Sequence, residues 1–223
     1  MIRKFLIAAF VLISFSSIAQ VVTEETKRKF TFGLDIFADL WQDVPSSIEP
    51  KTINPGVNIF GSYNYIFGTS NVSFSPGLGL GMHNLYSDSW LISTSDSSYF
   101  EPINSDSISF KKSKLTATYV DIPFELRYKS DGDFRLAIGF KFGFLIRGHT
   151  KFKGDDFIDG TTNEVIIKKK KLPYMETTRY GFTGRIGYKW LNLWGYYQLS
   201  TLFQKGKGPE MYPISIGITV IPF

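Results

Sequence analysis

Charged side chains recur at every second position in several segments, and they are the residues of this sequence best suited to chemistry or to ion binding. Side chains two positions apart in a β-strand point to the same side, so each series would share one face. A buried charge is tolerated only when it is paired, so acids and bases on such a face must meet. The series predicts an interior charge network of four carboxylates and five cations: Asp35, Asp39, Asp121, Glu125, Arg135, Lys141, Arg147, Arg179 and Arg185.

Two functions are open to this charge network. It could line a path for ions or a substrate. It could instead be a structural set of salt bridges that plugs a barrel, because the interior of an eight-stranded barrel is just wide enough to be filled by side chains. We favour the plug, since so narrow an interior leaves no open channel.

The two histidines, His83 and His149, lie on the same polar series near one end of their segments. Histidine acting with a serine and an acid could make the protein a lipid-modifying enzyme. Neither histidine lies in a motif whose spacing selects that chemistry, so we expect no catalytic residue, no metal and no cofactor. The sequence has no cysteine, which excludes disulfides, a thiolate metal site and a lipid-modified cysteine.

Four consecutive lysines, Lys168, Lys169, Lys170 and Lys171, end a long polar connection. Ammonium groups at a membrane surface attract the phosphates of lipids, so the run could form a basic loop on the lipid surface. A solvated loop also accommodates such a run. The sequence favours neither alternative.

Strict alternation of apolar and polar residues predicts the strands that would position these groups. The connections between the strands alternate between long and short, as in a membrane barrel with short turns on one rim and long loops on the other. The fold class is therefore predicted to be all-β, an eight-stranded antiparallel up-and-down transmembrane β-barrel. The predicted strands cover approximately residues 29–41, 57–65, 72–86, 114–129, 134–149, 179–188, 191–203 and 214–220.

Glycines on the polar face, such as Gly81 and Gly143, decide which face points inward. On a water-facing surface they would only weaken the strands, whereas inside a narrow barrel they make room for long charged side chains. The apolar face then meets lipid, with aromatic girdles at both rims. The short-turn girdle would contain Phe30, Tyr65, Phe67, Phe74, Tyr128, Phe134, Tyr188 and Trp190, and the long-loop girdle Trp41, Tyr86, Tyr174, Phe203 and Tyr212.

The segment Ser130-Asp131-Gly132 predicts a three-residue hairpin loop, and a hairpin's turn sets the register of its strands. That register places Asp121 opposite Lys141, which predicts an inward ion pair. Proline cannot donate to a strand ladder, so we expect a β-bulge at Pro76 and another at Pro123.

The chain begins like a secretory signal peptide, with Arg3 and Lys4 before an apolar run and Ser17-Ile18-Ala19 as a cleavage signal. The predicted organisation is a signal peptide over 1–19, a short periplasmic segment over 20–28 and one barrel domain over 29–223. Removing the signal lowers the formal net charge from +5 to +3, because two basic and no acidic residues are lost. No nucleic-acid partner is indicated.

The segment from Tyr119 to Leu126 (YVDIPFEL), the glycine-rich third strand and the terminal Phe223 resemble the porin-T type of outer-membrane β-barrel domain that is common in Bacteroidetes. The resemblance covers roughly residues 28–223. It implies location in the outer membrane, outer-membrane lipid and the barrel-assembly machinery as partners, and an envelope or secretion complex as a further candidate partner. It implies no particular reaction. We therefore expect a non-enzymatic barrel that anchors surface loops for binding or envelope organisation; the alternatives are a lipid-modifying barrel enzyme and a narrow transport pore.

Overall fold

The computed structural model describes residues 23–222 except for 47, 104–107 and 157–160. The expected signal peptide and the terminal Phe223 lie outside the described residues. Among the residues described, no helix is long and apolar enough to cross a membrane.

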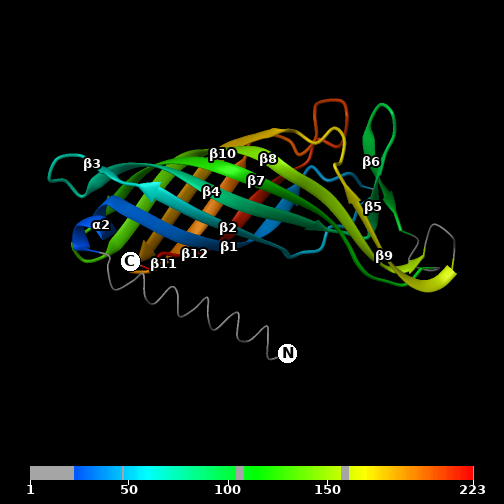
Figure 1. Ribbon diagram of the computed structural model, residues 1–223, viewed down its shortest axis with the longest axis horizontal. Coiled ribbons are helices and arrows are strands. Elements are labelled where there is room, and N and C mark those ends of the chain that lie inside the picture. The colour runs from blue at the N-terminus through cyan, green and yellow to red at the C-terminus, as the bar shows by residue number, and fades with distance from the viewer. Residues whose placement is uncertain (1–22, 47, 104–107, 157–160, 223) are drawn as a thin grey trace.

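Eight strands form a closed, hydrogen-bonded ring, which confirms the predicted fold class (Figure 1). Each strand pairs antiparallel with the next, and the last pairs with the first, so lipid meets no unpaired strand edge around the ring. The ring consists of β1 (Phe30–Gln42), β2 (Asn54–Tyr63), β4 (Val72–Tyr86), β7 (Phe110–Lys129), β8 (Phe134–Asp156), β10 (Thr178–Tyr188), β11 (Leu191–Gln198) and β12 (Tyr212–Val220).

The remaining elements lie at the two ends of the ring (Figure 1). At the short-turn end lies the helix α2 (Glu24–Lys29), capped by the Thr23 side chain, together with β3 (Tyr65–Ile66), which pairs with β4. At the long-loop end lie β9 (Thr161–Lys170) and a hairpin of β5 (Ser89–Ser93) and β6 (Ser98–Pro102). The larger additions, β9 and the β5–β6 hairpin, therefore belong to the long-loop rim, whereas among the described residues the short-turn rim adds only α2 and the two-residue β3.

Only part of β8 belongs to the barrel wall. Its first half pairs with β10 from Phe134 to Phe144, a length that suits a membrane-spanning strand of about 9–11 residues. Beyond that point β8 pairs with β9 instead, from His149 onward. The ends of β7 and β8 therefore project past the ring and form a three-stranded extension with β9 (Figure 1).

The apolar face points outward and the polar face inward, as the glycines predict. Phe32, Ile138 and Phe182 are more than half exposed, at 52%, 62% and 57%. Asp35 and Asp39 are fully buried. This is the inverse of a water-soluble barrel, and it gives the outer surface the apolar band that lipid requires.

The register of the β7–β8 hairpin differs from the prediction. Lys129 pairs with Arg135, so Asp121 lies opposite Gly143 rather than Lys141. The expected bulges at Pro76 and Pro123 are also absent, since the ladders run through both prolines without a register shift. One shift lies instead between Thr118 and Tyr119, where β8 has one extra residue, Ile146, and a second lies farther out, between Phe110 and Lys112. Such a bulge exchanges the two faces of the strand beyond it.

The aromatic rims are confirmed in part. The short-turn residues, such as Tyr65 and Trp190, are exposed at 61% and 56%. At the long-loop end, Trp41 and Phe203 are buried, at 8% and 1% exposed, because the surface loops fold over them. These two residues therefore belong to the core under the loops and not to a lipid-facing girdle.

Candidate functional site

The first cluster of the lumen is a carboxylate held between two cations. Arg179 donates from Nη2 to both carboxylate oxygens of Asp121, at 2.6 and 2.9 Å, and from Nε at 3.1 Å. Lys141 Nζ lies 3.6 Å from the same carboxylate. All three side chains are buried. The predicted pair of Asp121 and Lys141 is therefore present, but Arg179 is the closer partner of Asp121.

A second cluster lies nearer the short-turn end. Arg185 bridges two acids, bonding Glu125 through Nη1 and Asp35 through Nη2, the latter at 3.0 Å. Glu125 also forms an ion pair with Arg127, whose Nη2 lies 2.7 Å from the carboxylate of Glu125. Asp35 accepts further bonds from Asn58 at 2.7 Å and Thr219 at 2.6 Å. These charges come from β1, β7 and β10, so only closure of the ring brings them together.

The remaining acid, Asp39, binds a histidine. His83 Nδ1 lies 2.9 Å from Asp39, and Ser215 donates to the same carboxylate at 2.6 Å. Serine and histidine therefore each contact the acid, and among the described residues no hydrogen bond joins the serine to the histidine. Nucleophilic catalysis requires the serine to bond the histidine and the acid to orient that histidine. With all three side chains buried, this cluster has the geometry of a structural hydrogen-bond group.

Aromatic faces fill the space around the cations. Lys141 Nζ lies 3.7 Å from the ring centre of Tyr196, Arg179 lies 3.9 Å from that of Tyr119, and Arg185 4.4 Å from that of Phe60. A cation over an aromatic face is stabilised by the ring quadrupole, and more so where water is excluded. Each buried cation thus has an aromatic partner in addition to its carboxylate.

Glycines make room for this packing, as predicted. A Cβ on Gly143 would lie 2.3 Å from an oxygen of Asp121 and 2.8 Å from Arg179. A Cβ on Gly81 would lie 2.8 Å from both of those side chains. The two glycines on opposite sides of Asp121 are therefore required by the ion pair and not by the backbone.

Two members of the predicted network lie elsewhere. Arg147 is exposed on the outside of the extension, because the extra residue Ile146 moves it to the outer face. His149, expected on the polar inner face, follows it outward for the same reason. Arg135 is half-buried at the short-turn end, where its Nε has no hydrogen-bond partner.

The four lysines do not form one basic loop. Lys168 to Lys170 are the last residues of β9, and strand alternation sends them to different sides. Lys168 and Lys170 face outward with Arg147 and His149, whereas Lys169 lies over the ring of Trp90 at 5.6 Å. Lys171 follows the strand with a positive φ of 57°.

An apolar layer closes the lumen at the long-loop end. It is built from side chains of the ring strands, of the β5–β6 hairpin, and of three loops: the one between β1 and β2, the one before β10 and the one after β11. Its buried members are Trp41, Ile48, Leu85, Leu91, Phe100, Leu115, Ala117, Tyr119, Met175, Leu202, Phe203 and Met211. The lumen is therefore sealed twice, by this layer and by the charged clusters below it.

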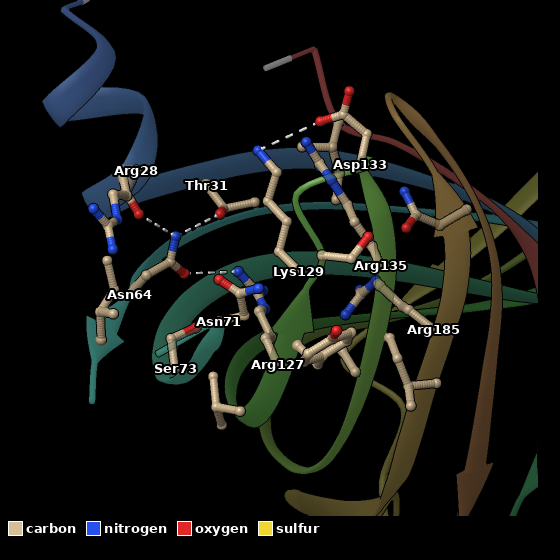
Figure 2. Close-up of a pocket in the computed structure, with 18 of the residues that line it drawn as sticks. Arg28, Thr31, Asn64, Asn71, Ser73, Arg127, Lys129, Asp133, Arg135 and Arg185 are labelled. Atoms are coloured by element: carbon tan, nitrogen blue, oxygen red, sulfur yellow. Dashed lines mark hydrogen bonds and ion pairs between the residues drawn. The ribbon is translucent and has the colours of Figure 1, made fainter. Parts of the chain in front are cut away.

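The cavities agree with a sealed lumen. Between the charged clusters, beside Asn58 and Trp194, the free volume is about 10 Å³, which is about the space of one water molecule. At the short-turn end a much larger vestibule of about 940 Å³ opens, lined by Arg127, Arg135 and Arg185 among others (Figure 2). In that view Asn64 joins Arg28 and Thr31 to Arg127, and Lys129 reaches Asp133 (Figure 2). Within the described part of the chain, the barrel thus opens at the short-turn end, and the apolar layer covers the long-loop end.

Comparison with known families matches residues 19–204 to the outer membrane protein beta-barrel domain. The chain belongs to this family. Its place is accordingly the outer membrane, which agrees with the apolar outer surface and the closed ring. No curated protein matches the chain.

Several residues that build the lumen of this outer-membrane barrel were left out of the interior residues predicted from the sequence. Arg127 shares a face with Glu125 two positions away, and that spacing could have placed it in the network. Trp194 and Tyr196 alternate along β11 with Leu193 and Tyr197, which are exposed. This alternation could have predicted that Trp194 and Tyr196 point into the lumen. Among the described residues, no three His, Asp or Glu side chains are grouped so as to hold a metal ion.

Proposed function

We propose that this chain is a non-conducting outer-membrane barrel without catalytic activity, which anchors surface loops for binding or for envelope organisation. The observation that carries the proposal is the double seal of the lumen. The charged clusters leave about 10 Å³ between them, and the apolar layer with Leu85 and Phe203 fully buried covers the long-loop end. A scaffold closed in this way has its accessible groups on its surfaces, where the β5–β6 hairpin and β9 project furthest (Figure 1).

The finer assignments of the proposal rest on the sequence. Residues 1–19 direct export as a signal peptide, the barrel is of the porin-T type, and the barrel-assembly machinery inserts it into outer-membrane lipid. An envelope or secretion complex is the candidate partner of the loops. The buried positions of His83, Asp39 and Ser215 support the absence of a lipid-modifying activity, because a lipid could not reach them.

Conductance in planar lipid bilayers tests the seal. The purified full-length chain should give no resolved single-channel steps, because water and ions have no continuous path past Lys141 and Arg179. The protein is delivered to the bilayer in lipid vesicles, and heat-modifiable migration of protein recovered from these vesicles verifies that the barrel is folded and inserted. A water-filled porin of about sixteen strands, a size at which barrels leave an aqueous channel, serves as the positive control in the same bilayers.

Discrete conductance steps from the incorporated protein would contradict the non-conducting anchor and favour a narrow transport pore. In that event substitutions at Lys141 or Arg179 should change the ion selectivity, since these cations would line the path.

A further inference from the structure

The outer face of the extension carries an uncompensated group of cations. It is a shallow cavity of about 400 Å³ lined by Lys112, Lys114, Arg147, His149, Lys151, Lys168 and Lys170, called here the outer basic cluster. These residues come from three strands, β7, β8 and β9, and are far apart in the sequence. Of the residues that the structure describes, those lining the cavity include no carboxylate.

Strand pairing sets the cations directly beside one another. Lys114 of β7 pairs with Lys151 of β8, which in turn pairs with Lys168 of β9. His149 pairs with Lys170 in the next row. Neighbouring strands lie about 4.8 Å apart, and like charges directly opposite one another destabilise a sheet. The arrangement therefore lowers stability unless an anion binds there.

Elsewhere in the same extension, lysines are paired with a carboxylate of the protein itself. Farther from the membrane, Glu164 accepts Lys111 at 2.5 Å and Lys153 at 3.0 Å. Within the described part of the chain, no carboxylate pairs with any member of the outer basic cluster. Burial, followed by the charges of Arg147 and the neighbouring lysines, holds the pKa of His149 below its ordinary value. The cluster therefore combines six lysine and arginine side chains with an imidazole whose charged form they disfavour.

The other face of the extension is already occupied. Trp90 of β5 packs on Phe152 of β8, and Ile167 of β9 lies against the same apolar cluster. The hairpin therefore covers the inner face, and the basic face is the one left open. Lys112 and Lys114 also lie 5.5 and 5.4 Å from the ring centre of Tyr86, which holds them at the cavity.

The position of the cluster relative to lipid identifies its ligand. On the lipid-facing side of β8, Phe142 and Phe144 are 45% and 47% exposed and Ile146 is 58% exposed, and Arg147 follows directly. The strand advances roughly 3.3 Å per residue, so the cluster extends about 13 Å along the tilted strand from Arg147 to Lys151, and Arg147 lies in the first layer directly beyond the apolar band. That layer contains lipid headgroups. The short turns of such barrels face the periplasm, so this rim meets the outer leaflet.

We infer that the outer basic cluster is a binding site for the phosphate groups of a lipid in the outer leaflet. Phosphate offers several acceptor oxygens to ammonium and guanidinium groups at once. The bound headgroup would neutralise the rows of lysines and hold the extension, with its hairpin, against the membrane surface. This inference goes beyond the anchoring function and does not depend on whether the lumen conducts.

Native mass spectrometry of the full-length protein in neutral detergent measures the binding directly. The probes are bisphosphorylated lipid A, the same lipid with both phosphates removed, and inorganic phosphate. We expect the bisphosphorylated lipid to bind, the phosphate-free lipid to bind at least about tenfold more weakly, and inorganic phosphate to compete only at much higher concentration, because each basic residue near a phosphate-bearing surface contributes about 1 kcal/mol.

Three variants make the test specific. Arg147→Gln, Lys151→Gln and Lys168→Gln combined should weaken binding of the bisphosphorylated lipid about a hundredfold, from the same contribution per charge. The matched control, Arg28→Gln with Lys129→Gln and Lys205→Gln, removes the same charges elsewhere and should bind as the wild type does. Lys168→Gln with Lys170→Gln changes only β9, which is outside the ring, and should still weaken binding where the triple variant fails to fold.

Equal binding of the phosphorylated and phosphate-free lipids would overturn the inference, as would wild-type binding by a folded cluster variant. Inorganic phosphate that binds as tightly as the lipid would show that a free anion, and not a headgroup, is the ligand.

Discussion

At the residue scale, the lumen depends on carboxylates that each meet more than one donor. Asp121 binds Arg179 through a pair of close contacts and Lys141 through a longer one. Asp35 and Glu125 share Arg185. Because desolvation of a lone buried charge costs more than an ion pair returns, such sites tolerate the loss of a whole group better than the loss of one partner.

Two double-mutant cycles that share Asp121→Ala test this ranking. Removing either Asp121 or Arg179 alone should cost about 3–5 kcal/mol, whereas removing both should cost much less than the sum. The cycle with Lys141→Ala should show weaker coupling. Lys141 Nζ lies 3.6 Å from the carboxylate of Asp121, whereas Arg179 Nη2 lies 2.6 Å from it. Unfolding in detergent or lipid gives the energies.

The exposed pair of Lys29 and Glu25 on α2 is the matched control for these cycles, and no coupling is expected there because solvent screens it. Additive effects for Asp121 and Arg179 would mean that the charges do not act as a unit.

At the element scale, each wall strand has a lipid side whose tolerance of charge depends on depth. Ile138 lies near the middle of the wall segment of β8 and is 62% exposed, whereas Phe134 begins that segment at the short-turn rim. Ile138→Arg should cost about 2–4 kcal/mol and Phe134→Arg about 0–1 kcal/mol, because the penalty falls from the bilayer midplane to the interface.

Reversible unfolding in phospholipid vesicles measures both variants on one strand. If they cost the same, the apolar band is not centred on the wall segment that pairs with β10. If both are neutral, the exposed face of the barrel does not meet lipid.

At the scale of the whole molecule, the long-loop end should face the cell exterior and the short turns the periplasm. The sequence has no cysteine, so single cysteines can report on each side. Ser95→Cys lies at the exposed tip of the β5–β6 hairpin, and Asp131→Cys in the exposed β7–β8 turn. A membrane-impermeant maleimide should label Cys at position 95 on intact cells and Cys at position 131 only after the outer membrane is opened.

Labelling of position 131 alone on intact cells would mean that the barrel is inserted in the opposite orientation, and the outer basic cluster would then face the periplasm. Labelling of neither on intact cells, with both labelled after lysis, would contradict exposure of the hairpin at the surface.

Sequence alone was enough to predict the eight wall strands and their two faces, because side-chain alternation is a local property with a period of two residues. It did not predict the β5–β6 hairpin or β9, which lie within the long loops. Gly81 and Gly143 even indicated which face must hold the large charges. The pairing of acids with bases was decided by the tertiary structure, since Asp35 meets Arg185 only when the ring closes.

The tertiary structure also decided the fate of Arg147 and the lysines. One extra residue, Ile146, opposite the step from Thr118 to Tyr119 turns Arg147 and His149 outward, where β9 brings Lys168 and Lys170 beside them. A bulge has no local signature here, because it arises from how two strands fit across the sheet, and the two prolines that suggested one are accommodated within continuous ladders. Alternation therefore identifies a face only up to the first register shift, and beyond it the three-dimensional pairing determines what a side chain meets.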